Sequence, residues 1–255
     1  MLKRRIIPIQ LLINGRLVKT RQFGAYRDVG DPVASSRVYN SQNADELVFL
    51  NIDRDVRSVE PMLGLLDRVS EVTFMPLALG GGIRTAAEAA RLIREGADRV
   101  VVNSAVYRDY GIVAEIADRF GAQAVIVGID ARYDADQGRY VLYSDCGREA
   151  ERVTLDEHMA TARAYGAGEF LVNSIDNDGM MQGYDLRLLR DAARAALPVP
   201  VIGCGGAGHY NHLREAFLDT GVSALACGSL FNFGDNNPIR AKAYLSNYGI
   251  PFKVV

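Results

Sequence analysis

Two glycine-rich stretches decide the fold of this chain: Ala78-Leu-Gly-Gly-Gly-Ile-Arg84 and Ile202-Gly-Cys-Gly-Gly-Ala-Gly208. Each stretch follows a short apolar run and leads into a segment with helical periodicity. Consecutive glycines between a strand and a helix let backbone N–H groups approach an anion closely, and the start of a helix favours negative charge. Either stretch alone could be a tight connection without a ligand. The presence of both favours two phosphate-binding turns.

The segments that follow the two turns match one another. Gly96-Ala-Asp98 leads into Val100-Val-Val-Asn-Ser104, and Gly221-Val-Ser223 leads into Ala224-Leu-Ala-Cys-Gly-Ser229. The two copies are offset by roughly half the chain. Such a long period indicates duplicated half-structures rather than a short solenoid repeat.

The composition is that of an ordinary globular protein. The 255 residues are 49% hydrophobic and 24% charged, with a formal net charge of −2, and the length suits a domain with a sizeable core. No basic cluster predicts nucleic-acid binding, and no apolar run is long enough to predict a membrane span. Because Cys146, Cys204 and Cys227 lack metal-binding spacing, we expect reduced thiols in a cytoplasmic protein.

Apolar runs of strand length alternate with helix-period segments along the whole chain. The runs are rich in Val, Ile and Leu without polar alternation, which is typical of a parallel sheet covered on both faces. Eight such pairs predict an α/β fold, a single (β/α)8 TIM barrel over residues 1–255 with an internal pseudo-twofold half-barrel repeat. A doubly wound open sheet is the alternative. The predicted strands are Arg5–Leu11, Leu47–Ile52, Met75–Leu79, Val100–Asn103, Ala124–Ile129, Phe170–Asn173, Val199–Gly203 and Ala224–Cys227. The predicted helices are Pro32–Gln42, Arg57–Val69, Ala86–Glu95, Ile112–Phe120, Leu155–Tyr165, Leu186–Ala195, Tyr210–Leu218 and Ile239–Tyr248.

Two connections that follow strands are long. Ile13 to Gly30 combines glycines with basic residues, which suits a mobile lid over an anionic ligand, although a solvated loop would look the same. Ala131 to Val153 contains Gln137-Gly138, a turn signal that predicts a small hairpin.

In a barrel of this kind the ligand site lies on the loops after the strands. Glycines, short hydroxyls and amides at these positions predict two phosphate cradles, and hence an elongated ligand with a phosphate at each end. Lys19 on the lid could add charge at one end. The first cradle is predicted from Gly81, Gly82, Asn103 and Ser104, and the second from Gly205, Gly206, Gly228 and Ser229.

Carboxylates that follow strands are the acid–base candidates. Asp130 closes the fifth predicted strand, and Asp176-Asn-Asp178-Gly179 follows the sixth. The alternatives are a loop-anchoring carboxylate for Asp130 and an Asx turn for Asp176 and Asp178. His209 and His212 are three residues apart, but no carboxylate or thiol nearby completes a metal set. We therefore predict no metal and no cofactor.

The other end of the predicted barrel carries alternating charges. Arg5, Glu46, Arg99 and Glu169 lie at or just before the starts of four strands. They could form a salt-bridged plug at the bottom of the barrel, or they could be scattered surface charges.

Together these motifs identify a resemblance over nearly the full length of the chain. The chain resembles the cyclase subunit of imidazole glycerol phosphate synthase. The segments that carry the resemblance include Asn14-Gly-Arg-Leu-Val-Lys19, Asp45-Glu-Leu-Val-Phe-Leu50, Gly80-Gly-Gly-Ile83, Gly96-Ala-Asp98, Ile129-Asp-Ala131, Ser174-Ile-Asp-Asn-Asp-Gly179, Gly183-Tyr-Asp185 and Gly205-Gly-Ala-Gly208.

The resemblance implies a barrel that pairs with a glutaminase subunit. Ammonia from the partner would pass a charged gate at the bottom, matched by Arg5, Glu46, Arg99 and Glu169, with Arg99 where lysine is usual. Asp98 matches a docking contact, and Lys19 matches the lid lysine. The ligand would be a bis-phosphorylated ribulosyl formimino compound, converted to imidazole glycerol phosphate and an aminoimidazole carboxamide ribotide.

The catalytic pair departs from the pattern of that family. Asp130 matches one of its two aspartates, but Leu11 stands at the position of the other, and Asn51 replaces a usual aspartate. Gln10 is adjacent to Leu11, but alternation along a strand should point it to the other side. Losing one acid–base group typically costs about 10²–10⁴-fold in rate.

Three functions remain open. The first is a divergent paralogue that docks a glutaminase and delivers ammonia to another acceptor, directly or through a third amidotransferase protein, as in the amidation of sugars for surface polysaccharides. The second is a working cyclase of histidine biosynthesis. The third is a non-catalytic phosphate-binding scaffold.

Overall fold

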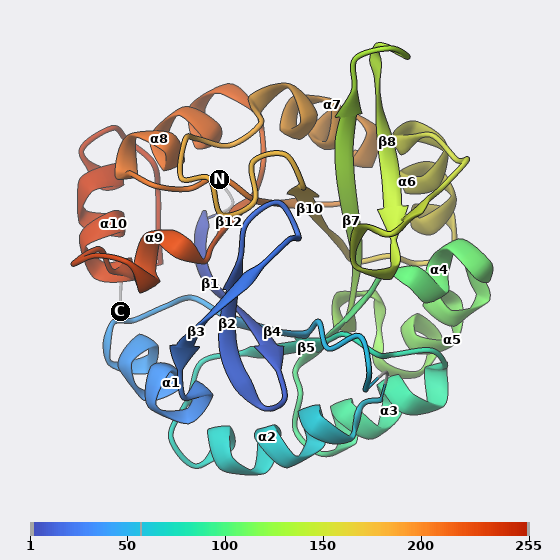
Figure 1. Cartoon of the computed structure of the whole chain (residues 1–255), viewed down its shortest axis with the longest axis horizontal. Coiled ribbons are helices and arrows are strands. Elements are labelled where there is room, and N and C mark those ends of the chain that lie inside the picture. Colours follow the sequence, from blue (N-terminus) through green and yellow to red (C-terminus); the bar gives the residue numbers. More distant parts are fainter. Residues whose placement is uncertain (1–2, 57, 254–255) are drawn as a thin grey trace.

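Eight parallel strands pair in the order β10–β11–β12–β1–β4–β5–β6–β7 in the computed structural model, and pairing of β7 with β10 closes them into a barrel (Figure 1). The predicted (β/α)8 barrel is therefore confirmed, and the open sheet is excluded. The structure describes residues 3–56 and 58–253, so Arg57, the predicted start of the second helix, lies outside the described residues. The barrel strands are β1 (Arg5–Ile13), β4 (Leu47–Asn51), β5 (Leu77–Gly80), β6 (Arg99–Val102), β7 (Val125–Asp134), β10 (Glu169–Ser174), β11 (Val201–Cys204) and β12 (Ala224–Cys227).

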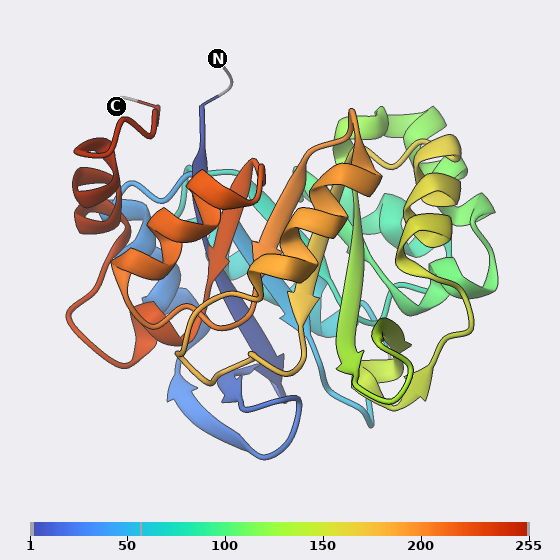
Figure 2. The same ribbon diagram turned by 90° about the horizontal axis from the view of Figure 1, so that it is seen from above.

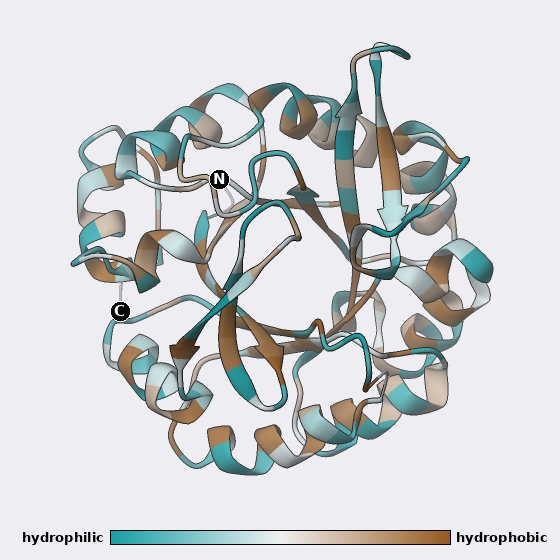
Figure 3. Cartoon of the chain, viewed as in Figure 1, coloured by the Kyte–Doolittle hydropathy of each residue, from teal (hydrophilic) through white to brown (hydrophobic). Residues whose placement is uncertain are grey.

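The helices form an outer ring, with apolar faces toward the sheet and polar faces outward (Figure 3). Local sequence sets where several of them begin. Thr85 and Thr154 each form a capping box with a glutamate three residues later, and Asp185 accepts a hydrogen bond from the backbone N of Leu188. The outer helices are α1 (Pro32–Ser41), α2 (Glu60–Ser70), α3 (Ala86–Arg94), α5 (Gly111–Phe120), α6 (Leu155–Ala164), α7 (Leu186–Ala196), α8 (Tyr210–Asp219) and α10 (Pro238–Ser246).

The sheet buries side chains on both faces, as the unbroken apolar runs predict. Between the sheet and the helices lies the larger core, which contains Phe49 and Phe170 at 0% exposure. A second cluster fills the inside of the barrel. Its members are Ile7, Ile9, Val48, Ala78, Val101, Ile126, Leu171, Ile202, Cys204, Ala224 and Ala226.

The segment Ile13 to Gly30 is more regular than a loop. Its strands β2 (Arg16–Thr20) and β3 (Tyr26–Gly30) form an antiparallel hairpin, and β2 also pairs with the end of β1. The regularity has a packing cause, because Leu17 and Val18 are each 2% exposed. The hairpin crosses the mouth of the barrel (Figure 1).

The predicted hairpin around Gln137-Gly138 is confirmed. β7 runs on past the barrel to Asp134 and pairs with β8 (Arg139–Ser144), which pairs in turn with β9 (Glu149–Ala150). Three short helical turns were not predicted: α4 (Ser104–Arg108), α9 (Ser229–Asn232) and η1 (Ala122–Ala124). A further 3-10 turn, η2 (Asp145–Gly147), lies between β8 and β9. Each is too short to produce a periodic apolar pattern.

The two ends of the barrel differ. Figure 2 shows both chain ends on one side of the barrel and the β2–β3 hairpin on the opposite side, where the strands end. Within the described ranges, no helix is long and apolar enough to cross a membrane.

Candidate functional site

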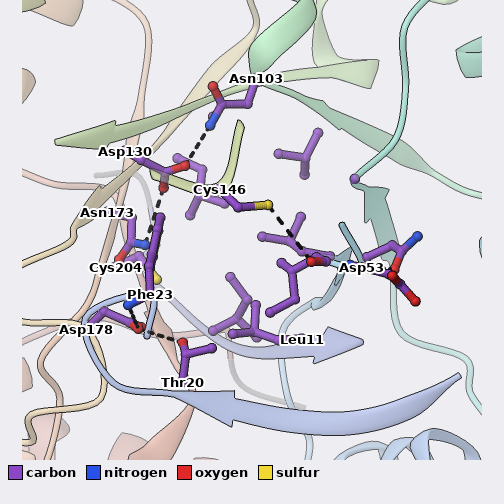
Figure 4. Close-up of a pocket in the computed structure, with 18 of the residues that line it drawn as sticks. Leu11, Thr20, Phe23, Asp53, Asn103, Asp130, Cys146, Asn173, Asp178 and Cys204 are labelled. Atoms are coloured by element: carbon purple, nitrogen blue, oxygen red, sulfur yellow. Dashed lines mark hydrogen bonds between the residues drawn. The ribbon is translucent and has the colours of Figure 1, made fainter. Parts of the chain in front are cut away.

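The carboxyl ends of the barrel strands surround a cavity of about 690 Å³ (Figure 4). The lining residues come from strand ends and loops far apart in the sequence, because parallel strands of a barrel all end at the same face. The predicted site residues that line the cavity are Leu11, Lys19, Gly81, Gly82, Asn103, Ser104, Asp130, Asp178, Gly179, Gly205, Gly206, Gly228 and Ser229.

Asp176 is not among the residues that line the cavity. Its Oδ2 accepts a hydrogen bond from the backbone N of Tyr133 (2.9 Å), and its Oδ1 lies 3.6 Å from Nε of Arg132. Both partners belong to the β7–β8 hairpin. The side chain therefore anchors that hairpin, a role that neither the acid–base prediction nor the Asx-turn alternative for this residue anticipated.

The glycines of both cradles need the conformations that glycine permits. Gly81 and Gly82 have φ of +87° and +78°, and Gly205 and Gly206 have φ of +89° and +105°. There is also no room for a side chain, because a Cβ on Gly81 would lie 2.0 Å from the carbonyl O of Asn51. The two turns are thus built alike, and each places bare backbone against the cavity.

The serines of the two cradles begin the short helices. Ser104 is the first residue of α4, and Ser229 is the first residue of α9. Ser104 Oγ already accepts a hydrogen bond from the backbone N of Asp145 (3.0 Å), which leaves its proton free to be donated. Loop η2 and the first cradle are therefore tied together.

Asp130 is held at the wall of the cavity by two amides. Asn103 Nδ2 donates to Oδ2 (2.8 Å), and Asn173 Nδ2 donates to Oδ1 (3.3 Å) (Figure 4). Burial raises the pKa of Asp130 to about 7, the charge of Asp178 acts in the same direction, and the two amides oppose them. A carboxyl group with a pKa near neutrality can both donate and accept a proton at physiological pH.

Leu11 faces the cavity from β1, and Gln10 does not. Gln10 is 1% exposed, and its Nε2 donates to Ser35 Oγ (2.7 Å) on helix α1 outside the barrel. The expected alternation is confirmed, so Gln10 supplies nothing to the cavity. β1 contains no Asp or Glu.

Asn51 at the end of β4 organises its own loop. Its Nδ2 donates to the carbonyl O of Val56 (3.3 Å), and its Oδ1 accepts from the backbone N of Asp53 (3.1 Å). Both contacts are local, so the amide shapes the loop that leads toward α2.

Lys19 lies at the end of the cavity formed by the second cradle. It is 7% exposed, and its Nζ donates to the carbonyl O of Ile9 (2.6 Å). A Cβ on Gly228 would lie 2.8 Å from this Nζ. Burial lowers the pKa of Lys19 to about 8, and the charge of Asp178 opposes the shift.

Arg5, Glu46, Arg99 and Glu169 form a closed ring of ion pairs at the opposite end of the barrel. Arg5 pairs with Glu46 (2.8 Å) and with Glu169, and Arg99 pairs with Glu46 (3.3 Å) and with Glu169 (2.5 Å). Glu46 and Glu169 are 3% and 2% exposed. The four residues are therefore a salt-bridged plug rather than scattered surface charges.

Asp98 lies on the rim outside this ring. Asp98 is exposed, and its Oδ2 accepts a hydrogen bond from the backbone N of Leu77 (2.8 Å). Arg99 is also tied to the rim, because its Nε donates to the carbonyl O of Gln123 (2.9 Å). The ring thus connects to loops on the outer face.

Three residues around the mouth were missed by sequence reasoning. Arg54 Nη2 donates to the carbonyl O atoms of Phe23 (3.3 Å) and Cys146 (3.4 Å), and all three residues line the cavity. They belong to three separate loops. No local pattern could have indicated this meeting, because only closure of the barrel brings the loops together.

The part of the chain that the structure describes contains no group of three or more His, Cys, Asp or Glu side chains that could hold a metal ion. The arrangement that it does contain is a cavity with two glycine-lined ends, one carboxyl group of near-neutral pKa and one buried lysine.

This geometry agrees with a comparison against known protein families. The family model described as histidine biosynthesis protein matches residues 5–237, which covers all eight barrel strands and both glycine-rich turns. The match extends over most of the 255 residues. The chain therefore belongs to the histidine biosynthesis protein family.

Proposed function

We propose that this protein is a synthase-type barrel that docks a glutaminase subunit, receives ammonia through the ring of Arg5, Glu46, Arg99 and Glu169, and delivers it to an acceptor in the cavity. In this proposal the chain has been diverted from histidine synthesis to the amidation of a surface-polysaccharide sugar. A third amidotransferase protein would complete that transfer if the acceptor does not itself enter the barrel.

The observation that carries the diversion is Leu11 in the wall of the cavity. The resemblance places an aspartate at this position, where it would act together with Asp130. An apolar side chain cannot transfer a proton, and Gln10 hydrogen-bonds outside the barrel. The cyclisation expected of the family would therefore lack one of its two acids, at a cost of about 10²–10⁴-fold in rate.

The interior of the barrel supports a passage for a small neutral molecule. The layer between the charged ring and the cavity is apolar, and it includes the small side chains of Ala78, Ala224 and Ala226. Neutral ammonia crosses such a layer at less cost than ammonium, because burying an isolated charge is far more expensive than burying a small polar molecule. The ring at the entrance supports a gate, since its ion pairs must separate before anything passes.

A working cyclase is the second candidate. The pKa of Asp130 is raised to about 7 by burial, and its two amide contacts hold it toward the cavity. One well-placed acid–base group could sustain slow turnover. This candidate predicts turnover of the ribulosyl formimino substrate without any substitution.

Turnover with this substrate and excess ammonium salt separates the two candidates. We expect the unmodified protein to be inactive and Leu11→Asp to gain activity by about 10²-fold or more, because it restores the second carboxyl group. Leu11→Asn is the matched control, because asparagine is close to aspartate in size and polarity but has no carboxyl proton to transfer. If the unmodified protein turns over this substrate at a rate close to that of the cyclases it resembles, it is a working cyclase. That result would contradict the proposed diversion from histidine synthesis.

The docking part is tested separately with a glutaminase subunit of the same family. We expect the glutaminase to co-purify with the barrel and to hydrolyse glutamine faster in the complex. An Asp98→Lys variant should weaken the complex, because the exposed carboxylate is the predicted docking contact, whereas Asp134→Lys at the far end should not. Absence of any complex would remove this part of the proposal and favour the scaffold.

A further inference from the structure

Asp178 holds the end of strand β2 against the cavity. Its Oδ2 accepts hydrogen bonds from Thr20 Oγ1 (2.7 Å) and from the backbone N of Phe23 (3.5 Å) (Figure 4). Its backbone carbonyl O also accepts from the backbone N of Gln22 (2.9 Å). All three donors lie in the short segment from Thr20 to Phe23, so Asp178 holds this corner of the β2–β3 hairpin at three points.

That corner carries Lys19, the residue next to Thr20. Both residues are 7% exposed, and the Nζ of Lys19 donates to the carbonyl O of Ile9 (2.6 Å). The position of a Cβ on Gly228 lies 2.8 Å from Nζ, so the amine stands directly over the backbone of the second cradle. Moving the corner of the hairpin would move this amine.

Asp178 also influences the charge of Lys19. Burial raises the pKa of Asp178 itself, whereas its hydrogen bonds from Thr20 and Phe23 and the charge of Lys19 favour the carboxylate. Burial lowers the pKa of Lys19 to about 8, and the carboxylate of Asp178 is the group that opposes this shift most strongly. The other groups are the thiols of Cys204 and Cys227 on strands β11 and β12. Burial raises the pKa of Cys227 to about 12 and the pKa of Cys204 further, so both thiols are neutral near pH 8.

We propose that Asp178 is a positioning residue for an anionic ligand: it keeps Lys19 charged and holds it over the Gly228 end of the cavity without touching the anion itself. This inference rests on the proposed anion-binding function of the second cradle. The proposal predicts that removing the charge of Asp178 weakens anion binding. Simple repulsion predicts the opposite, because removing a carboxylate beside an anion site would by itself tighten anion binding.

Two variants separate the charge of Asp178 from its hydrogen bonds. Asp178→Asn removes the charge and keeps a side-chain oxygen that can accept from Thr20 and Phe23. Thr20→Val removes the hydroxyl donor and keeps the carboxylate. The titration of Lys19 is then followed by NMR of the protein labelled with ¹³C-lysine, without any ligand. Lysine occurs at only Lys3, Lys19, Lys242 and Lys253, so Lys19→Arg assigns the signal.

We expect the pKa of Lys19 to fall by about one unit in Asp178→Asn, because the group that favours its charged form is lost. Thr20→Val should not lower it. An unchanged Lys19 titration in Asp178→Asn would overturn the proposal. A rise toward the ordinary lysine value would also overturn it, since that would mean that Asp178 only keeps the hairpin closed.

Sulfate binding measured by calorimetry gives the second readout, because sulfate keeps its charge over the whole pH range used. A one-unit fall in the Lys19 pKa predicts about fivefold weaker sulfate binding to Asp178→Asn at about pH 8, and no loss at about pH 6, where the lysine is charged in both proteins. Tighter binding at both pH values would support simple repulsion and contradict the proposal.

These two readouts distinguish the inference from the function on which it rests. Failure of the unmodified protein to bind sulfate, or equal binding by Lys19→Ala, would remove the anion site at the second cradle. The Lys19 titration still decides whether Asp178 sets the charge of this lysine. Neither result depends on a glutaminase or on an acceptor.

Discussion

Burial at the mouth of the barrel brings the pKa values of opposite groups toward each other. The pKa of Asp130 rises to about 7 and the pKa of Lys19 falls to about 8, both chiefly because the charged form is taken out of water. Near neutral pH each group therefore exists in both protonation states. Both protonation states are useful in a site that must exchange protons with a ligand. The burial that shifts the two pKa values also makes the folded protein less stable.

The substitution Asp130→Asn tests this cost. The pKa of Asp130 in the folded protein is raised above its ordinary value of 3.8. Between these values the folded protein keeps a proton that the unfolded chain has lost, so stability falls as the pH rises toward 7. From about pH 5.5 to about pH 8 the native protein should lose about 2 kcal/mol relative to Asp130→Asn.

Thermal unfolding at both pH values checks this prediction. The Tm of Asp130→Asn should exceed that of the native protein by a few degrees at the higher pH, and the difference should shrink at the lower pH. A difference that does not change with pH would mean that the carboxyl group of Asp130 does not titrate in this window.

At the scale of elements, the β2–β3 hairpin is closed over the mouth by the loop that follows β10. Gly179 in this loop has φ of +69°, and a Cβ on it would lie 2.1 Å from the carbonyl O of Thr20. Gly138 at the tip of the other hairpin has φ of +66° but nothing within 4 Å of its Cβ position. The two glycines have nearly the same φ and differ in what surrounds them.

Alanine substitutions at these two glycines therefore separate the effect of backbone strain from the effect of displacing the β2–β3 hairpin. Each should cost about 1 kcal/mol from the left-handed backbone conformation, but only Gly179→Ala should push the hairpin off the cavity. Trypsin should then cleave after Arg21 and Arg27 several-fold faster in Gly179→Ala than in Gly138→Ala. Equal cleavage of the two variants would show that the hairpin does not depend on the contact at Gly179.

At the scale of the whole molecule, the ring of Arg5, Glu46, Arg99 and Glu169 joins four strands at the bottom of the barrel. Its glutamates are almost fully buried, and burial raises the pKa of Glu46 while both arginines oppose the shift. Removing one partner leaves buried charge without compensation, so the ring should matter for stability as well as for passage.

We expect Glu46→Ala to lower the free energy of unfolding by about 3–5 kcal/mol in urea titrations. Glu60→Ala is the control, because Glu60 also lies close to an arginine (Arg91, 2.7 Å) but its side chain is 62% exposed. An exposed pair should contribute less than about 1 kcal/mol. Similar losses in the two variants would contradict a special role for burial of the ring.

Much of the architecture followed from short-range pattern. The predicted ends of strands and helices lie within a few residues of the observed ends. Examples are the apolar run Val100–Asn103, which is a strand, and the periodic segment Ala86–Glu95, which is a helix. Strand β7 is longer than predicted because it continues into the hairpin with β8. The half-barrel repeat, the docking role of Asp98 and the ligand roles of the cradles stay predictions.

By itself the sequence determined the barrel and most of the cavity residues, because the end of every parallel strand must reach the same face. It also determined that position 11 carries no acid, a fact that needs only the residue type. Tertiary structure alone decided that Asp176 faces the β7–β8 hairpin, that the four charges at the bottom form a ring, and that Asp178 holds the corner beside Lys19. These contacts join residues far apart in the chain, so only barrel closure and burial determine them.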